Sequence, residues 1–312
     1  MAEAWGRRRA VALTLAIELV LAGAVFGAAR VTTPQLGPDF VDIAEVPVGA
    51  TPAAVTAFSW DCGRDEIGHR NTANIVVTPR KAGPAHHVHE YVGNLSVDVG
   101  STVEGLPGGG TTCPNGDEST YYWPVLRTVR EGDGPHGGAI QVPASVTLTV
   151  YGNPRGPVLP MPRLLRGAVG DAYALTNGGA LAAPVWSCQG AEQRRTLEYP
   201  ICGAGQRVVR IFDFPSCWDG RQVDTEGHRR QLVPPVAGGG CPASTFAVPR
   251  LEIVVAYDIP QGTRFRIDTF DAQRHSPRTD HAFFVNLMPE TLSRKIAACL
   301  NNTTPCPGPR GG

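Results

Sequence analysis

The sequence lacks an excess of charge of either sign. Its 312 residues contain 28 Lys and Arg against 28 Asp and Glu, so the formal net charge is +0. A neutral chain offers no basic surface for the counterion release that drives nucleic-acid binding, and we expect no nucleic-acid partner. The sequence also has no GxSxG, HExxH, P-loop or GxGxxG signature. These absences exclude the common serine hydrolases, zinc peptidases and nucleotide-binding enzymes.

Long helical patterns are also scarce. Hydrophobic residues make up 42% of the chain, which also has 37 Gly and 28 Pro. It is too apolar for a disordered protein and too interrupted for a helical bundle. Short β-favouring runs recur at residues 74–78, 139–151, 207–214, 251–257 and 263–270, and only Pro289 to Leu300 has a helical pattern. We therefore predict an all-β, disulfide-stapled β-sandwich, jelly-roll-like, with long loops and a short C-terminal helix.

The N-terminus has the pattern of an export segment. Three arginines, Arg7 to Arg9, precede an apolar run from Ala10 to Ala29 that is interrupted by Glu18. Residues 1–29 are therefore predicted to be a signal peptide or an N-terminal anchor, and either one places the remaining chain outside the cytoplasm. The membrane would be contacted only through this segment, if it is not cleaved. We expect residues 30–53 to be a linker, residues 54–302 a single domain and residues 303–312 a disordered Pro/Gly tail.

The cysteines number eight and form no CxxC or zinc-ribbon spacing. An even count behind an export segment favours disulfides over a thiolate metal site. About 105 pairings are possible for eight cysteines. The short loops favour the pairs Cys62 with Cys113, Cys188 with Cys202, Cys217 with Cys241, and Cys299 with Cys306.

The segment Pro84 to Asn94 contains three of the eight histidines within four positions. On a strand, His87 and His89 would project to one face while Val88 faces the core, and two imidazoles on one face suit a metal site. The alternative is a polar strand edge whose histidines only form hydrogen bonds. His281, which follows Asp280 and precedes an apolar run, is the best candidate for a third imidazole. It could equally brace a strand.

A second segment, Phe214 to Arg230, concentrates carboxylates and an imidazole. Asp219 and Asp224 are candidates for a catalytic base or for a group that orients a metal ligand, and His228 is a weaker candidate ligand. Asp219 with Gly220 could instead form a turn. Tyr121, Tyr122 and Trp123 could line a sugar-binding cleft, or they could belong to the core.

Taken in order, several motifs resemble one known family. They are Phe58 to Cys62, His87-Val-His89 to Gly93, Tyr121 to Leu126, Trp186 to Cys188, Phe214 to Gly220, Asp224 to Arg229, Cys241-Pro242 and His281 to Asn286. This order resembles the domain of unknown function nineteen ninety-six over about residues 55–300. The sequence departs from the family at Phe283, where an acidic residue is usual, and in a shortened spacing between Tyr121 and Pro124.

The resemblance implies a secreted microbial protein that acts at a polysaccharide or cell-wall surface, because some members carry carbohydrate-binding modules. The family's recurring histidines would correspond here to His87, His89, His228 and His281. No activity is attached to the family as a whole. A fainter similarity is to copper-dependent hydroxylases, in which a Pro-Ile-Val strand precedes a His-His-Met element. Here residues 75–79 precede His86-His87, and Val88 stands where the methionine would be.

These patterns lead to one functional hypothesis and two alternatives. The first is an exported metal-assisted enzyme acting on extracellular polysaccharide or cell wall, with copper or zinc held by His87, His89 and His281. The second is a non-catalytic glycan or cell-wall binding module. The third is a copper-dependent oxidase-like protein.

Overall fold

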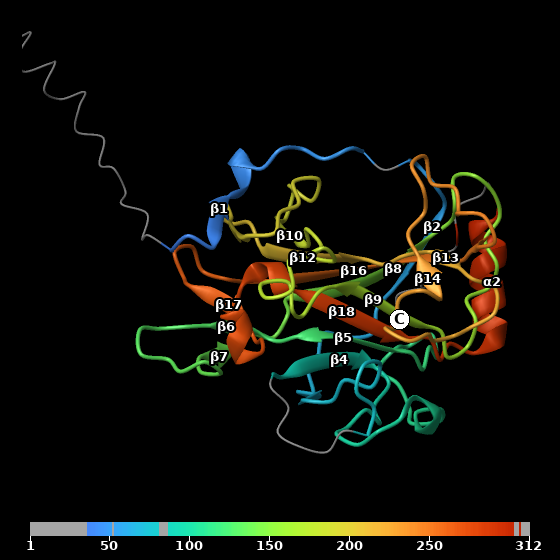
Figure 1. The fold of residues 1–312 in the computed structure, drawn as a ribbon, viewed down its shortest axis with the longest axis horizontal. Helices are drawn as coiled ribbons and strands as arrows, with labels where there is room; N and C mark the ends of the chain where they lie inside the picture. The colour runs from blue at the N-terminus through green and yellow to red at the C-terminus, as the bar shows by residue number, and fades with distance from the viewer. Residues whose placement is uncertain (1–35, 52, 81–86, 303–305, 307–312) are drawn as a thin grey trace, which may run out of the picture. The chain divides into compact units, whose positions relative to one another are not determined.

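Two five-stranded sheets face each other in the computed structural model, which describes residues 36–51, 53–80, 87–302 and 306 (Figure 1). Side chains from both sheets meet in one apolar core. Trp123 stacks on Phe212 with ring centroids 6.2 Å apart, and Phe214 meets the edge of Phe284 at 5.1 Å. The prediction of a disulfide-stapled β-sandwich with a short C-terminal helix is confirmed.

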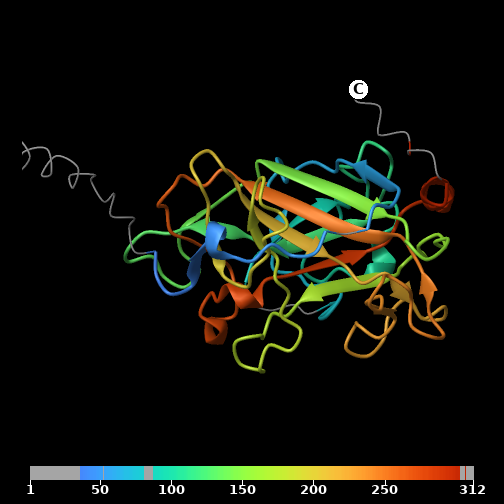
Figure 2. The ribbon, with the colours of Figure 1, turned by 90° about the horizontal axis from the view of Figure 1, so that it is seen from above.

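The first sheet has the strand order β10-β12-β16-β8-β2, and its neighbouring strands are antiparallel. In β16 the residues Leu251, Ile253 and Val255 alternate with more exposed neighbours, so one face packs on the core. Figure 2 shows β8, β16 and β12 side by side, with α2 at one end. The strands are β10 (Trp186–Cys188), β12 (Val208–Asp213), β16 (Arg250–Tyr257), β8 (Ser145–Tyr151) and β2 (Ala57–Trp60).

The second sheet has the order β3-β4-β5-β18-β9 and positions the candidate site. Strands β4, β5 and β18 are buried along their whole length, because their inner face packs on the first sheet. Their outer face packs on a second apolar cluster that includes Ile75, Val97 and Leu106 from loops. The strands are β3 (Arg70–Asn71), β4 (His89–Gly93), β5 (Thr120–Pro124), β18 (His281–Val285) and β9 (Arg166–Gly170).

Three small sheets and several helical turns complete the described chain. A parallel pair joins β1 (Phe40–Asp42) to β11 (Tyr199–Ile201). One three-stranded sheet contains β14 (Leu232–Val233), β13 (Cys217–Trp218) and β15 (Phe246–Ala247), and another contains β17 (Phe265–Ile267), β6 (Leu126–Thr128) and β7 (Ala139–Ile140). The helical elements are α2 (Glu290–Leu300) and the 3-10 turns η1 (Ile43–Glu45), η2 (Val103–Gly105), η3 (Asp271–Gln273) and η4 (Pro277–Thr279).

All eight cysteines are paired, and the four predicted disulfides are confirmed. They join Cys62 to Cys113, Cys188 to Cys202, Cys217 to Cys241, and Cys299 to Cys306. Each bond restricts the unfolded chain and stabilises the fold by roughly 2 to 4 kcal/mol. Four disulfides indicate an extracellular or otherwise oxidising compartment.

Two local predictions were wrong. Residues 36–46, expected in a linker, are folded: β1 pairs with β11, and Leu36, Ile43 and Val46 are buried. Residues 74–78, expected as a strand, form a turn, because the Asn74 side chain accepts a hydrogen bond from the Val77 amide and its carbonyl accepts one from Thr78.

The predicted export segment, residues 1–29, lies outside the described residues, as does the C-terminal tail apart from Cys306. Among the described residues, no helix has the length and apolar character needed to cross a bilayer.

Candidate functional site

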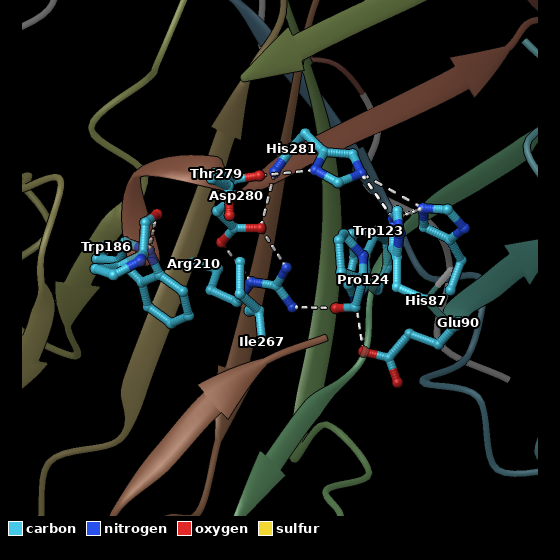
Figure 3. A network of polar contacts seen from close by, with 12 residues as sticks. His87, Glu90, Trp123, Pro124, Trp186, Arg210, Ile267, Thr279, Asp280 and His281 are labelled. Atoms are coloured by element: carbon cyan, nitrogen blue, oxygen red, sulfur yellow. Dashed lines mark hydrogen bonds and ion pairs between the residues drawn. The ribbon is translucent and has the colours of Figure 1, made fainter. Parts of the chain in front are cut away.

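Three histidines from distant parts of the chain meet at one end of the second sheet. His87 precedes β4, His89 begins β4 and His281 begins β18. The Nε2 atom of His87 lies 3.1 Å from that of His89 and 3.4 Å from that of His281, and the His89 and His281 Nε2 atoms are 3.4 Å apart (Figure 3). The three ring nitrogens therefore converge on a single point.

Backbone carbonyls fix the tautomers of two of these rings. Nδ1 of His89 lies 3.0 Å from the Ala73 carbonyl oxygen, and Nδ1 of His281 lies 2.8 Å from that of Thr279. A carbonyl oxygen only accepts hydrogen bonds, so each Nδ1 carries the hydrogen and each Nε2 keeps a lone pair. Lone pairs of His89 and His281 thus face each other, an arrangement that a bound cation would stabilise.

The spacing of the nitrogens fits a metal ion. For metal–nitrogen bonds of about 2.0–2.1 Å and tetrahedral angles, neighbouring ligand nitrogens lie about 3.4 Å apart. The observed separations of 3.1 to 3.4 Å match this value on all three sides. Three protein ligands leave a further coordination position for water or substrate, as in catalytic zinc sites. The buried triad of His87, His89 and His281 could therefore hold a metal ion.

Burial favours the neutral form, which ligates metals, at His89 and His281. All three residues are at most 6% exposed. Burial lowers the pKa of His281 to about 4. Burial also lowers the pKa of His89 well below its ordinary value, and the nearby His87 and His281 lower it further. These two imidazoles are thus available to a cation without first losing a proton at neutral pH.

Buried carboxylates hold the strands that carry the ligands. Asp268 accepts a hydrogen bond from the Val88 amide, between His87 and His89, and is itself bound by Arg127 and His136. Asp280 lies immediately before β18 and points to the opposite face of the sheet from His281, where it forms a buried two-point ion pair with Arg210 (Figure 3). Two consecutive residues at the start of β18 therefore face the core and the candidate site, respectively.

A cavity of about 380 Å³ opens above the triad. Phe270 meets the edge of His87 at a centroid distance of 4.7 Å, and Tyr173 stacks on Phe270 at 4.7 Å with an interplanar angle of 13°. Tyr173 is 51% exposed and presents an aromatic face to solvent. The lining combines apolar and polar groups, including Thr72, Asn74, Val77, Asp171, His228, Arg229 and Phe283.

The structure places His228 and Asp224 together beside the triad. His228 lines the cavity, but it is not one of the three residues whose ring nitrogens converge. Its Nδ1 atom lies 2.8 Å from Asp224 Oδ1. Asp219 is not among the cavity residues. Its Oδ1 atom accepts hydrogen bonds from the amides of Arg221 and Gln222, so it stabilises the turn that was the alternative interpretation.

The sugar-binding interpretation of Tyr121, Tyr122 and Trp123 was wrong. All three lie in β5 and are at most 3% exposed. Tyr121 and Trp123 belong to the core between the sheets, and Tyr122 packs in the outer cluster near His89. An aromatic run on a central strand is buried on both faces here, because loops cover the outer face of this sheet.

Sequence reasoning missed the other side chains of the cavity, chiefly Tyr173, Phe270, Arg229 and Asp171. Tyr173 and Asp171 follow β9, while Phe270 precedes η3 and Arg229 follows His228 in a long loop. They meet only because distant loops converge above the second sheet. One local signal was present in the sequence. Tyr173 is an aromatic residue in a segment that contains Gly and Asn, and such a segment predicts an exposed loop in which an aromatic side chain is a candidate for binding.

Comparison with known proteins gives one result. No curated protein and no solved structure matches the chain. The model of a single family, described as a domain of unknown function (DUF1996), matches residues 75–283, a range that includes all three triad histidines, Asp224 and His228. The chain therefore belongs to the DUF1996 family, a domain of unknown function.

Proposed function

We propose that this protein is an exported metal-dependent enzyme that acts on an extracellular polysaccharide or on the cell wall. The observation that carries the proposal is the convergence of three Nε2 atoms within 3.4 Å of one another at a cavity of about 380 Å³. A metal held by three imidazoles with an open position supplies Lewis acidity to an oxygen atom of water or substrate.

The shape of the triad favours zinc over copper. Imidazole nitrogen suits both metals. In a square-planar copper site, two of three ligands lie opposite each other, about 4 Å apart at bond lengths of about 2 Å. The three separations are instead nearly equal, at 3.1, 3.4 and 3.4 Å. This equality supports a tetrahedral zinc site with a water or substrate at the fourth position, and it disfavours the copper oxidase-like alternative.

The surroundings of the triad support a carbohydrate substrate. A sugar ring has apolar faces and hydroxyl groups at its rim, so it is matched by an aromatic surface beside hydrogen-bonding groups. Tyr173 supplies an exposed aromatic face, supported from behind by Phe270. Asn74, Asp171 and Arg229 line the same cavity. Polysaccharides are also abundant in the oxidising compartments that four disulfides indicate.

A non-catalytic glycan-binding module is the second candidate, and the same exposed ring of Tyr173 favours it. In that case the aromatic surface binds a sugar whether or not a metal is present. The two functions predict different results when the metal is removed. An enzyme would lose its activity on the polysaccharide, whereas a binding module would still bind it.

The test is metal analysis of the full chain after dialysis against zinc and, separately, copper. We expect one zinc per chain in the wild type and in His69→Gln, a control histidine outside the triad whose Nε2 lies 2.6 Å from the Val97 carbonyl oxygen. We expect none in the double variant His87→Ala, His89→Ala or in His281→Gln. The metal-loaded and metal-free proteins are then incubated with a panel of polysaccharides, together with Tyr173→Ala.

The outcomes separate the candidates. Polysaccharide cleavage that requires zinc supports the enzyme. Binding that is lost in Tyr173→Ala but independent of zinc supports the glycan-binding module. Equal and negligible zinc in the wild type and the triad variants, all folded by circular dichroism, would overturn the metal site.

A further inference from the structure

A second histidine arrangement borders the same cavity and is not used by the triad. His228 lies in the loop between β13 and β14, beside Arg229, and its side chain is 23% exposed. Ligand nitrogens of His87, His89 and His281 lie within 4.8 Å of one another, whereas His228 is outside that group. His228 therefore lies where it can contact a molecule in the cavity without ligating the same ion.

Contacts behind the ring orient it. Nδ1 of His228 lies 2.8 Å from Asp224 Oδ1, and Asp224 Oδ2 accepts a hydrogen bond of 2.6 Å from Arg166 Nη1. A carboxylate accepts hydrogen bonds, so Nδ1 of the neutral ring carries the hydrogen and Nε2 is the basic nitrogen. The ring thus has one nitrogen bound to Asp224 and one free to accept a proton on the other side.

The backbone of the loop is shaped to hold this orientation. His228 has φ 57° and follows Gly227 at φ 78°, so two consecutive residues are in the left-handed region. This conformation is uncommon for a residue with a side chain, and such strain concentrates at functional sites. Two hydrogen bonds secure it: the His228 amide donates to the Thr225 carbonyl, and Gln231 Nε2 donates to the His228 carbonyl.

We propose that His228 is the general acid and base of this site, and that Asp224 and Arg166 are its positioning residues. The proposal rests on the metal-dependent enzyme proposed above. His228 Nε2 removes a proton from an O–H group of water or substrate. The O–H bond breaks, its electron pair stays on oxygen, and an N–H bond forms. Asp224 balances the charge of the imidazolium, and Arg166 balances that of Asp224.

In a hydrolysis the same proton then leaves Nε2 for the departing oxygen as the carbon–oxygen bond breaks, so the ring returns to its initial state. A positioned base of this kind typically accelerates a reaction by about 10² to 10⁴. The class of substrate is therefore one in which the O–H nucleophile and the oxygen leaving group lie on the same side of the reacting carbon, as in hydrolysis of an ester substituent of a polysaccharide. In a glycoside they lie on opposite faces and need two separate groups.

The test uses the full chain loaded with cobalt in place of zinc, because cobalt bands in the visible spectrum follow the ionisation of an oxygen ligand at the open position. We compare wild type, His228→Gln, the ligand variant His281→Gln and the control His69→Gln. We expect one cobalt per chain in His228→Gln, with the midpoint of the pH titration lowered by about one pH unit, because the neutral Nε2 accepts a hydrogen bond from bound water and so stabilises its protonated form. The control should titrate as the wild type.

Nitrogen NMR of the His228 ring in the zinc form tests the role of Asp224. We expect the hydrogen on Nδ1 in the wild type and loss of this preference in Asp224→Asn, whose side chain is matched in size but uncharged.

Two results would overturn the proposal. Cobalt lost from His228→Gln as completely as from His281→Gln would make His228 a ligand, and coincident titrations of His228→Gln and wild type would remove it from the reacting oxygen. Absence of cobalt and zinc from the wild type would instead overturn the proposed function itself.

Discussion

Two buried polar clusters lie on opposite faces of the second sheet and differ in how completely their groups are satisfied. On the inner face, Arg210 donates to both oxygens of Asp280, to the Pro124 carbonyl and to the Tyr257 hydroxyl. Glu90 accepts from Tyr257 and from Trp123 in the same network. On the outer face, the three histidines point their Nε2 atoms at one another.

The difference separates a cluster that stabilises the fold from one that could hold a metal ion. In the inner cluster, Arg210 faces acceptors on every side and meets the opposite charge of Asp280, so this ion pair is satisfied without a ligand. In the outer cluster, the Nε2 lone pairs of His89 and His281 face each other, an arrangement that a bound cation would stabilise. Buried polar groups whose donors meet acceptors within the protein stabilise the fold. Buried lone pairs that face each other indicate a ligand.

The largest expected effect is on the inner cluster. Arg210→Met leaves Asp280 buried without its partner, and we expect the free energy of unfolding to fall by about 3 to 5 kcal/mol, measured by urea denaturation. The control is Arg207→Ala, which removes a surface ion pair with Asp258 and should change stability by no more than about 1 kcal/mol. Similar losses of stability in Arg210→Met and Arg207→Ala would contradict the prediction that the buried ion pair contributes more than the surface one.

The outer cluster predicts loss of stability in acid when no metal is present. The pKa of His281 is lowered to about 4, so the unfolded chain binds this proton at a higher pH than the native state. Unfolding is therefore favoured as pH falls from about 6.5 to 4, by about 3 kcal/mol for this group. Chemical denaturation across this range should show that the free energy of unfolding depends less on pH in His281→Gln than in the wild type. The same pH dependence in both proteins would contradict the prediction.

Titration of Glu90 should change stability with pH in the opposite direction to His281, over nearly the same pH range. Burial raises the pKa of Glu90 to about 7, although hydrogen bonds from Tyr257 and Trp123 oppose the shift. The native state keeps this proton longer than the unfolded chain, so stability is lost as pH rises from about 4.5 to 7, by about 3 kcal/mol. Glu90→Gln should remove this loss and expose the slope of the histidines. A Glu90→Gln protein with the wild-type pH profile would be the contrary result.

Metal addition should act on the outer cluster alone. Zinc at 100 times its dissociation constant should stabilise the folded protein by about 2.7 kcal/mol, measured as an increase in the melting temperature with zinc concentration. His69→Gln, which lies outside the triad, should keep the increase, and His281→Gln should lose it. An equal increase in His281→Gln would mean that zinc binds elsewhere.

The sequence predicted the outer cluster better than the inner one, for a physical reason. His87 and His89 are two residues apart, and alternation along an extended chain places them on one face without knowledge of the fold. The disulfides followed from short loops between cysteines. The inner cluster forms only when strands that are far apart in sequence pair, so no local pattern predicts that Arg210, Asp280 and Glu90 lie close together. The same holds for Tyr173 and Phe270 at the cavity, which come from separate loops.

Strand β18 joins the two clusters, because Asp280 and His281 are consecutive and point to opposite faces. The backbone of the strand bonds to β5 on one side and β9 on the other. Local opening of this strand would separate the ion pair and the triad at the same time. Its amide hydrogens should therefore exchange with solvent only when the whole domain unfolds, and zinc should slow that exchange. Amide exchange along residues 281–285 would thus report occupancy of the site from within the core.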